Sequence, residues 1–400
     1  MTAVRPEGAD AAAEAEPDVD AELVDRVRGR LADRPGELSP HRVAEALRAA
    51  GRPVGDATVL AVYEALRRDV LGAGPLEPLL RLPGVTDVLV NGPDQVFIDR
   101  GEGLEETGVR FADDESVRRL AQRLAAKAGR RLDDAAPFAD LRLPDGSRCH
   151  AVLAPVSRPG TVISLRVPAA RAFTLDELVA AGSVDAHGAG LLQALVRARV
   201  AFLVSGGTGS GKTTLLAALL SRVDPAERLV LVEDASELRP DHPHVVALEG
   251  RPANVEGAGA IDLRTLVRQA LRMRPDRLVV GEVRGGEVVD LLAALNTGHD
   301  GGCGTLHANS AADVPARLEA LALAAGLDRA ATHSQLASGV AAVVHLARGR
   351  DGVRRLAEIA VPHRDRDGMV AMVPAVRFDG TTLREEAGAA ALAEALGRAR

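Results

Sequence analysis

The chain has 400 residues, of which 46% are hydrophobic and 2% aromatic, and its net charge is -7. This length allows two folded domains plus an extension, and the scarcity of aromatic side chains argues against stacking platforms for single-stranded nucleic acid. The first twenty residues hold six acids and one arginine, so the rest is nearly neutral and lacks the basic field of a DNA-binding protein.

The two cysteines, Cys149 and Cys303, have no metal-ligand spacing and are too few for a disulfide framework. We therefore expect free thiols in a reducing cytoplasm. No run of sequence approaches the roughly 18 apolar residues of a membrane span, and the acidic N-terminus does not resemble a signal peptide. The sequence thus predicts a cytoplasmic protein without direct membrane insertion, whose role at a membrane would go through a partner.

The N-terminal part is expected to contain a tail and a helical module. Residues 1–20 have hardly any large apolar side chain, which predicts disorder. Residues 21–74 show three helical patterns, and the pair Ser39-Pro40 is a good N-cap and first turn for the second.

Residues 75–168 are predicted to form a smaller α+β domain. One helix is expected from Asp114 to about Gly129. Short β-like runs surround it at 85–90, 95–99, 138–143, 148–153 and 161–167.

Residues 169–385 are predicted to form an α/β domain, followed by an Ala-rich tail over 386–400. Thr174 and Glu177 have the spacing of a capping box ahead of an apolar run. Helical patterns then alternate with apolar strands at 200–204, 228–232 and 278–281, which is typical of a doubly wound, mainly parallel sheet.

The segment from Leu203 to Leu215 fits the P-loop pattern G-x-x-x-x-G-K-[ST] between a predicted strand and a predicted helix. Glycines let the backbone turn N–H groups toward phosphate oxygens, and the helix adds its positive N-terminus. Lys212 would reach the β- and γ-phosphates of ATP, and the Thr213 hydroxyl would bind Mg²⁺. The predicted nucleotide contacts are Gly206, Gly207, Thr208, Gly209, Ser210, Gly211, Lys212, Thr213 and Thr214.

Lysine is almost absent from the chain. Of 49 basic residues only Lys127 and Lys212 are lysine. A compact ammonium fits between two phosphates where a planar guanidinium fits poorly, so a lysine is expected at the phosphate position. Lys127 is expected to be an ordinary surface residue.

Two apolar strands end in acids. Glu282 follows a strand where a P-loop fold places its Walker B carboxylate, and Gly281 stands where many such enzymes carry a Mg²⁺-binding Asp. Glu282 is therefore predicted to act on the attacking water, as a base or through water on the Mg²⁺. The second strand ends in Glu233 and Asp234, whose side chains should alternate in direction, and Glu233 is chosen for the nucleotide side. A solvated turn residue at 282 and a salt-bridging acid at 233 are the alternatives.

His299 and His307 flank a Gly-rich loop. An imidazole there can hydrogen-bond a γ-phosphate or report its loss, although each histidine taken alone is more often a capped or core residue. A metal site is disfavoured because no cysteine or acid completes a tetrahedral set.

Together these motifs resemble the type II/type IV secretion ATPase superfamily, most closely its tight-adherence pilus branch, the CpaF/TadA-type ATPases. The segments that carry the resemblance are the P-loop, 232–238, 271–286, 296–301 and 305–310, with 85–93 and 143–148 in the preceding domain. The resemblance covers roughly residues 75–360 and implies a RecA-like P-loop fold for residues 169–385 and a PAS-like fold for residues 75–168. It implies nucleotide-site roles for Glu233, Glu282 and His307, through the family's Asp box, atypical Walker B and His box.

The resemblance also implies a homo-hexameric ring in which arginines of the N-terminal domain meet nucleotide held by the C-terminal domain. The candidates are Arg142, Arg148 and Arg166, with Arg272, Arg274 and Arg284 as rivals. It further implies recruitment to the inner face of the membrane by an inner-membrane platform protein. The sequence departs from the family pattern at Gly302-Cys303-Gly304, where bulkier or hydroxyl residues are expected and where a cysteine could confer thiol sensitivity.

The expected function is Mg²⁺-dependent ATP hydrolysis that powers pilus assembly or secretion. One alternative is a DNA-transfer motor, which the near-neutral charge and scarce aromatic residues disfavour. Another is a nucleotide-gated scaffold with little turnover, which the acids at two strand ends disfavour.

Overall fold

The computed structural model describes residues 26–27, 30, 39–49, 55–101, 103–143, 145–168, 171–251, 253, 258–349, 351–378 and 383–398. The chain divides into two compact units, Met1–Pro168 and Ala169–Arg400. The expected disordered tail over 1–20 and most of the first predicted helix lie outside the described residues.

In the first unit, helices α2 (Pro40–Ala49) and α3 (Asp56–Leu71) pack through buried Val, Leu and Ala side chains. The Ser39 hydroxyl accepts a hydrogen bond from the Arg42 N–H at 3.4 Å, and Pro40 is the first residue of α2. The predicted start of this helix is therefore confirmed. A short 3₁₀ turn, η1 (Gly74–Leu76), and helix α4 (Glu77–Leu80) follow.

A six-stranded antiparallel sheet makes up the rest of this unit, in the order β3-β2-β1-β6-β5-β4. Its strands are β1 (Asp87–Asn91), β2 (Val96–Asp99), β3 (Leu104–Glu106), β4 (Phe138–Arg142), β5 (Arg148–Val152) and β6 (Val162–Arg166). Helix α5 (Asp114–Lys127) buries Val117, Leu120 and Leu124 in the core that it shares with the sheet. The five predicted strands and the helix are confirmed. Strand β3 was not predicted, because all three of its side chains are exposed and show no alternation.

The second unit is built on a nine-stranded mixed sheet in the order β15-β14-β13-β12-β7-β11-β10-β8-β9. The six strands from β12 to β9 run parallel, and the three at the other edge pair antiparallel. Their bounds are β7 (Phe202–Gly206), β8 (Leu229–Glu233), β9 (Val245–Glu249), β10 (Arg277–Val283), β11 (Cys303–His307), β12 (Ala342–Arg348), β13 (Arg354–Arg364), β14 (Val370–Phe378) and β15 (Leu383–Glu385). The α/β class is confirmed, whereas the antiparallel edge was not predicted.

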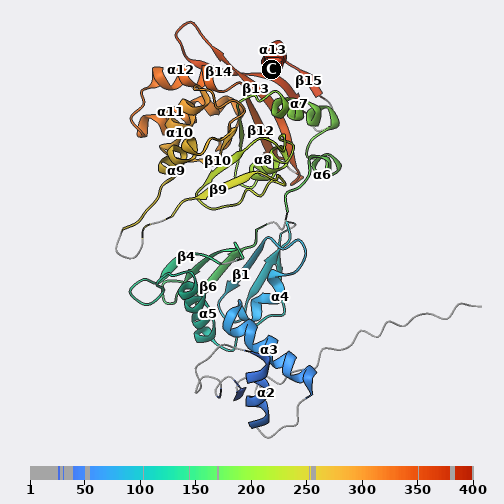
Figure 1. The fold of residues 1–400 in the computed structure, drawn as a ribbon, viewed down its shortest axis with the longest axis vertical. Coiled ribbons are helices and arrows are strands. Elements are labelled where there is room, and N and C mark those ends of the chain that lie inside the picture. The colour runs from blue at the N-terminus through green and yellow to red at the C-terminus, as the bar shows by residue number, and fades with distance from the viewer. Residues whose placement is uncertain are drawn as a thin grey trace, which may run out of the picture. The chain divides into compact units, whose positions relative to one another are not determined.

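Helices cover both faces of this sheet (Figure 1). One face carries α6 (Leu175–Ala180), α7 (Ala186–Arg197) and α8 (Lys212–Leu220). The other carries α9 (Leu263–Ala270), α10 (Glu287–Leu295), α11 (Val314–Ala324) and α12 (Arg329–Gly339), with short 3₁₀ turns η2 (Leu271–Met273) and η3 (Ala311–Asp313). The predicted capping box of α6 is present, with both the Thr174 and the Glu177 side chain bonded to backbone N–H groups.

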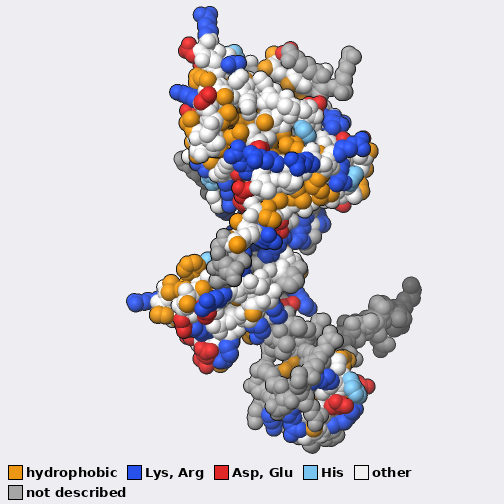
Figure 2. Space-filling view, turned by 60° about the vertical axis from the view of Figure 1, so that its left-hand side comes forward, with side chains coloured by type: hydrophobic (Ala, Val, Ile, Leu, Met, Phe, Trp, Pro, Cys, Tyr) orange, Lys and Arg blue, Asp and Glu red, His pale blue; other side chains and the backbone are white. Residues whose placement is uncertain are grey.

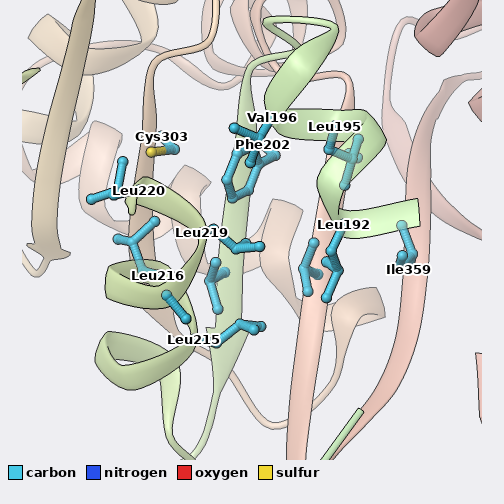
Figure 3. Packing of buried hydrophobic residues seen from close by; sticks show 14 of the residues in the cluster. Leu192, Leu195, Val196, Phe202, Leu215, Leu216, Leu219, Leu220, Cys303 and Ile359 are labelled. Atoms are coloured by element: carbon cyan, nitrogen blue, oxygen red, sulfur yellow. The ribbon is translucent and has the colours of Figure 1, made fainter. Parts of the chain in front are cut away.

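The core on the α8 face consists mainly of leucine, valine and alanine. Figure 3 shows leucines of α7 and α8 meeting Phe202 of β7, Cys303 of β11 and Ile359 of β13. Small aliphatic side chains pack densely and let a helix approach the sheet closely, so the core forms with few aromatic rings. This packing holds the start of α8 against the end of β7.

The segment expected to be an Ala-rich tail, residues 386–400, contains a helix in the structure. Helix α13 (Ala389–Arg398) buries Leu392 in the core beside α7 and α8, and the Gly388 N–H donates to the Pro374 carbonyl at 2.8 Å. Its alanine and leucine residues are helix formers with an apolar side to bury, so the segment packs onto the sheet. Among the described residues, no helix combines the length and the apolar character that crossing a bilayer requires.

Candidate functional site

Four parallel strands bring the predicted site residues together at their carboxyl ends, along one side of the sheet. At the carboxyl ends of β7 and β11, Gly206 lies opposite His307. On the next strands, Val280 of β10 lies opposite Val232 of β8, so Glu282 and Glu233 also come at this edge. Carboxyl ends of parallel strands are where open α/β sheets bind ligands.

The phosphate loop joins β7 to α8 at this edge. Gly211 is the N-cap of α8 with φ +94°, a conformation that favours glycine. A Cβ on Gly206 would lie only 2.5 Å from the Leu346 carbonyl oxygen and from the Ser210 hydroxyl. The loop can therefore close only with glycine at these two positions.

Lys212 is the buried cation of this loop. Its side chain is largely buried, and its ammonium donates hydrogen bonds to the carbonyl oxygens of Gly206 at 3.0 Å and Gly207 at 2.9 Å. Burial lowers the pKa of Lys212, whereas the nearby Glu282 carboxylate raises it and Arg284 lowers it. The loop therefore wraps around a cation that has an acid beside it.

The loop residues fit a bound triphosphate. The Ser210 hydroxyl is buried and has no hydrogen-bond partner in the part of the chain that the structure describes. Thr208 and Gly209 are exposed, while Thr213 and Thr214 are half-buried in the first turn of α8, whose N-cap has no side chain to bond its N–H groups. Free N–H groups and a lysine at a helix N-terminus are the groups that phosphate oxygens require.

A β-bulge in β10 sets the direction of Glu282. Val280 lies opposite Gly304 and Val283 opposite Leu306, so β10 has one residue more than β11 between these two pairs. Val280 and Val283 both belong to the core on the α9–α12 face, although strict alternation would put them on opposite faces. The bulge thus turns Glu282 to the α8 face, the side from which it influences the pKa of Lys212.

Two contacts fix this bulge. The buried Thr305 hydroxyl of β11 donates to the Gly281 carbonyl at 2.6 Å. A Cβ at residue 281 would lie 2.5 Å from the Cγ atom of Glu233. The glycine found in place of an aspartate therefore has a packing reason, since the Glu233 side chain fills the space above it.

Glu233 is almost fully buried, with an exposed fraction of 4%. One of its carboxylate oxygens accepts hydrogen bonds from the N–H groups of Glu237 and Leu238, both at 3.0 Å. Strand β8 is three strands from β7 in the sheet, a separation of roughly 14 Å at strand spacing. The structure therefore gives Glu233 a role in holding the loop after β8.

Arg284, one of the rival arginines, lies at the site in the same chain. Its guanidinium donates to Glu282 at 2.5 Å, and this hydrogen bond raises the pKa of Arg284, as do the charges of Asp234 and Glu237. The backbone N–H of Arg284 donates to the buried Glu287 carboxylate at 2.6 Å. Arg284 is thus anchored at its backbone and paired with Glu282 at its tip.

Sequence reasoning missed a buried histidine under the phosphate loop. His345 of β12 has its Nδ1 atom 2.9 Å from the Ser205 hydroxyl of β7, and its ring also contacts the backbone of Asn309. Burial lowers the pKa of His345, which keeps the ring uncharged at neutral pH. No sequence motif surrounds this histidine, so only the structure, through the contact with Ser205, shows that it lies near the phosphate loop.

His307 lies half-buried at the carboxyl end of β11, whereas His299 precedes its amino end.

Three of the candidate arginines are cross-strand neighbours in the first unit. Arg142 lies opposite Arg148 on β4 and β5, and Arg148 lies opposite Arg166 on β5 and β6. Arg166 also donates to Asp87 at 3.3 Å. Asp87 of β1 lies directly opposite Arg166, so an acid of the neighbouring strand adjoins this arginine row.

The rivals Arg272 and Arg274 precede β10 and so lie at the opposite edge of the sheet from Glu282, roughly 20 Å away along the strand. The structure does not bring them to the phosphate loop of the same chain. Most of the other arginines are on the surface, and Figure 2 shows a band of Lys and Arg side chains across one face of the second unit.

The Gly302-Cys303-Gly304 segment is buried, with no room for bulkier residues. A Cβ on Gly302 would meet Leu295 at 2.5 Å, and one on Gly304 would meet the Val280 carbonyl oxygen at 2.8 Å. Burial raises the pKa of the Cys303 thiol to about 12. The thiol is therefore protonated and unreactive, which disfavours the expected thiol sensitivity.

Residues 69–386 match the protein family described as "Type II/IV secretion system protein". The chain belongs to this family. The predicted superfamily is therefore confirmed, while the tight-adherence branch stays a prediction.

Several relatives of this secretion-system protein have been named. A Mycobacterium tuberculosis (strain H37Rv) protein with the provisional name of a conjugal transfer protein is 60% identical over 314 residues, which cover 77% of this chain and 89% of that one. The type IV secretion system protein PtlH of Bordetella pertussis is 36% identical over 262 residues, covering 59% and 76% of the two chains. The crystal structure of the pilus retraction motor PilT with bound ADP matches with a TM-score of 0.50 and 18% identity over 79% of this chain and 83% of that one. This last likeness concerns the fold alone.

The packing of Glu233 over Gly281 can be tested with Gly281→Ala. The new methyl group would overlap the Glu233 side chain, so we expect the free energy of unfolding to fall by about 1–3 kcal/mol. Gly190→Ala is the matched control, because a Cβ there meets nothing within 4 Å and the residue lies inside α7, where alanine is the better helix former. Calorimetric melting compares the two. Equal stability of Gly281→Ala and the unmodified protein would contradict the contact.

Proposed function

We propose that this secretion-family protein is a Mg²⁺-dependent ATPase with a RecA-like arrangement of its second unit. The observation that carries the proposal is the bulge in β10, which directs Glu282 toward the face of the sheet where Lys212 and the phosphate loop lie. A lysine in this position can bind the phosphates of a triphosphate, and the acid beside it can activate water.

Each site residue of the second unit has its own role in binding or hydrolysis. Lys212 and the N–H groups of the loop would hold the phosphates, and the Thr213 hydroxyl would hold Mg²⁺, which would neutralise phosphate charge. Arg284 bonds the Oε2 atom of Glu282, so we assign the Oε1 atom to the attacking water. Glu282 orients this water and accepts its proton.

Glu233 on β8 and His307 on β11 serve the same step from the two strands that flank β10. Glu233 supports the bulge by filling the space over Gly281 and fixes the loop after β8. His307, opposite the first glycine of the phosphate loop, contacts the γ-phosphate. The two side chains thus couple the presence of this phosphate to the loops that follow β8 and β11.

We propose that the protein works as a homo-hexamer in which the arginine row of Arg142, Arg148 and Arg166 contacts nucleotide held by a neighbouring copy. Three adjacent guanidiniums on one sheet suit the negative charge of a triphosphate. Hydrolysis would then move the two units and drive pilus assembly or secretion. The protein would act in the cytoplasm, recruited to the inner face of the membrane by a platform protein.

A conjugal DNA-transfer machine is the second candidate for the apparatus. The 60% identical mycobacterial relative is provisionally named for conjugal transfer. TrbB of Rhizobium radiobacter, which is 33% identical over 243 residues, is named a conjugal transfer protein. The chemistry of the site is the same in both cases.

Lys212→Ala should weaken ATP binding by at least about 100-fold, because it removes the charged donor to two phosphates. Lys127→Ala is the control, since it removes the other lysine of the chain, which lies on α5. Binding is measured by titration with a fluorescent ATP analogue. Similar affinities of the two variants would refute the phosphate site.

Glu282→Gln should keep ATP binding but lower kcat by about 100-fold or more, because an amide cannot accept the proton of the attacking water. Phosphate release and ATP affinity are measured on the same sample. Unchanged steady-state turnover would overturn the assignment of Glu282. Negligible turnover of the unmodified protein, with ATP still bound, would instead support the nucleotide-gated scaffold.

DNA distinguishes the two kinds of apparatus. A secretion or pilus motor should hydrolyse ATP at the same rate with and without double-stranded DNA. Stimulation by DNA that falls steeply as salt rises would favour the conjugal motor, because phosphate contacts release counterions.

A further inference from the structure

The β12–β13 hairpin reaches past the start of the phosphate loop. In the pairing of β12 with β7, Leu346 lies opposite Gly206, and β12 continues for two more residues to Arg348. Arg354 then begins β13 directly opposite Arg348. The tip of this hairpin therefore stands beside the phosphate loop, on the side of β7 away from β11 and β10.

One arginine of the hairpin touches the loop. The Cδ atom of Arg354 lies 3.5 Å from the position that a Cβ of Gly211 would take. Gly211 is the N-cap of α8, directly before Lys212. The guanidinium of Arg354 begins one bond beyond this Cδ atom, so it is within reach of a ligand bound at the N-terminus of α8.

Within the part of the chain that the structure describes, Arg354 differs from Arg348 and Arg355 in having no hydrogen-bond or ion-pair partner. Arg348 donates to the Gly352 carbonyl at 2.9 Å, and Arg355 forms two hydrogen bonds with Asp351, at 2.8 and 2.6 Å. Within the described part of the chain, the exposed Arg354 side chain makes no hydrogen bond and no ion pair. It stands close to a helix N-terminus, which is itself positive, so an anion is the partner that this position suits.

We propose that Arg354 binds the nucleotide in the same chain, at the α-phosphate end. The inference rests on the proposed function, because it takes the phosphate loop as the nucleotide site. Glu282 lies in β10, two strands from β7 on one side, and Arg284 directly follows this strand. Arg354 comes from the strand pair on the other side of β7. The transferred phosphate lies beside Lys212 and Glu282, so the Arg354 guanidinium contacts the part of the nucleotide that ADP and ATP share.

The test is Arg354→Ala, with Arg355→Ala as the matched control. Both variants remove one arginine from the same strand, but Arg355 is already paired with Asp351. We expect Arg354→Ala to raise the Kd of ADP and of ATP by the same factor, about tenfold, as the loss of one charged hydrogen bond predicts. The kcat at saturating ATP should change less than about twofold, because the lost contact binds the ground state and the transition state equally. Arg354→Lys should recover part of the affinity.

Three results would overturn the proposal. They are equal nucleotide affinities of Arg354→Ala and Arg355→Ala, a loss confined to ATP, and a fall in kcat without a change in Kd. Circular dichroism and the melting temperature show whether each variant is folded. A failure of the proposed function looks different, because Lys212→Ala would then bind nucleotide as well as the unmodified protein does.

Discussion

The arrangement of the site depends on one irregular step in the backbone of β10. A regular strand would send Glu282 to the face covered by α9–α12, where Val280 and Val283 are buried. The extra residue of the bulge places it on the face of α8. The Thr305 hydroxyl of β11 donates a hydrogen bond to the Gly281 carbonyl, and the Glu233 side chain of β8 fills the space where a Cβ of residue 281 would lie. The bulge therefore depends on β11 and β8 as well as on the sequence of β10. The direction of a single carboxylate is thus set by three strands.

The cations around the phosphate loop suit a site for a polyanion. Lys212 is held by two loop carbonyls, Arg284 is paired with Glu282, and Arg354 has no partner in the described part of the chain. These cations come from the loop, from β10 and from the β12–β13 hairpin, so they surround the loop from different sides. A bound polyphosphate would replace weak carbonyl contacts of the lysine with charged ones, and this exchange favours binding.

The sequence indicates the parts of the site more fully than their positions. The P-loop pattern and the alternation of apolar strands locate Lys212 and the ends of β8 and β10, because glycine spacing and hydrophobic runs are local signals. The bulge could have been suspected from a glycine inside a strand, but its effect on Glu282 needs the register with β11. His345 and Arg354 could not be found, because neither lies in a motif and each acquires its place through strand pairing. The antiparallel edge of the sheet was missed for the same reason. The sequence predicts a tail where helix α13 forms, because an alanine-rich composition does not indicate which side of the segment packs on the core.

The scarcity of aromatic residues in the core has a practical consequence. The chain contains no tryptophan, and its single tyrosine, Tyr63, belongs to α3 in the first unit. The second unit, which holds the phosphate loop, is therefore nearly silent in intrinsic fluorescence. A tryptophan placed in this unit would be the sole emitter of its kind, and its signal would report on that unit without background from the rest of the protein.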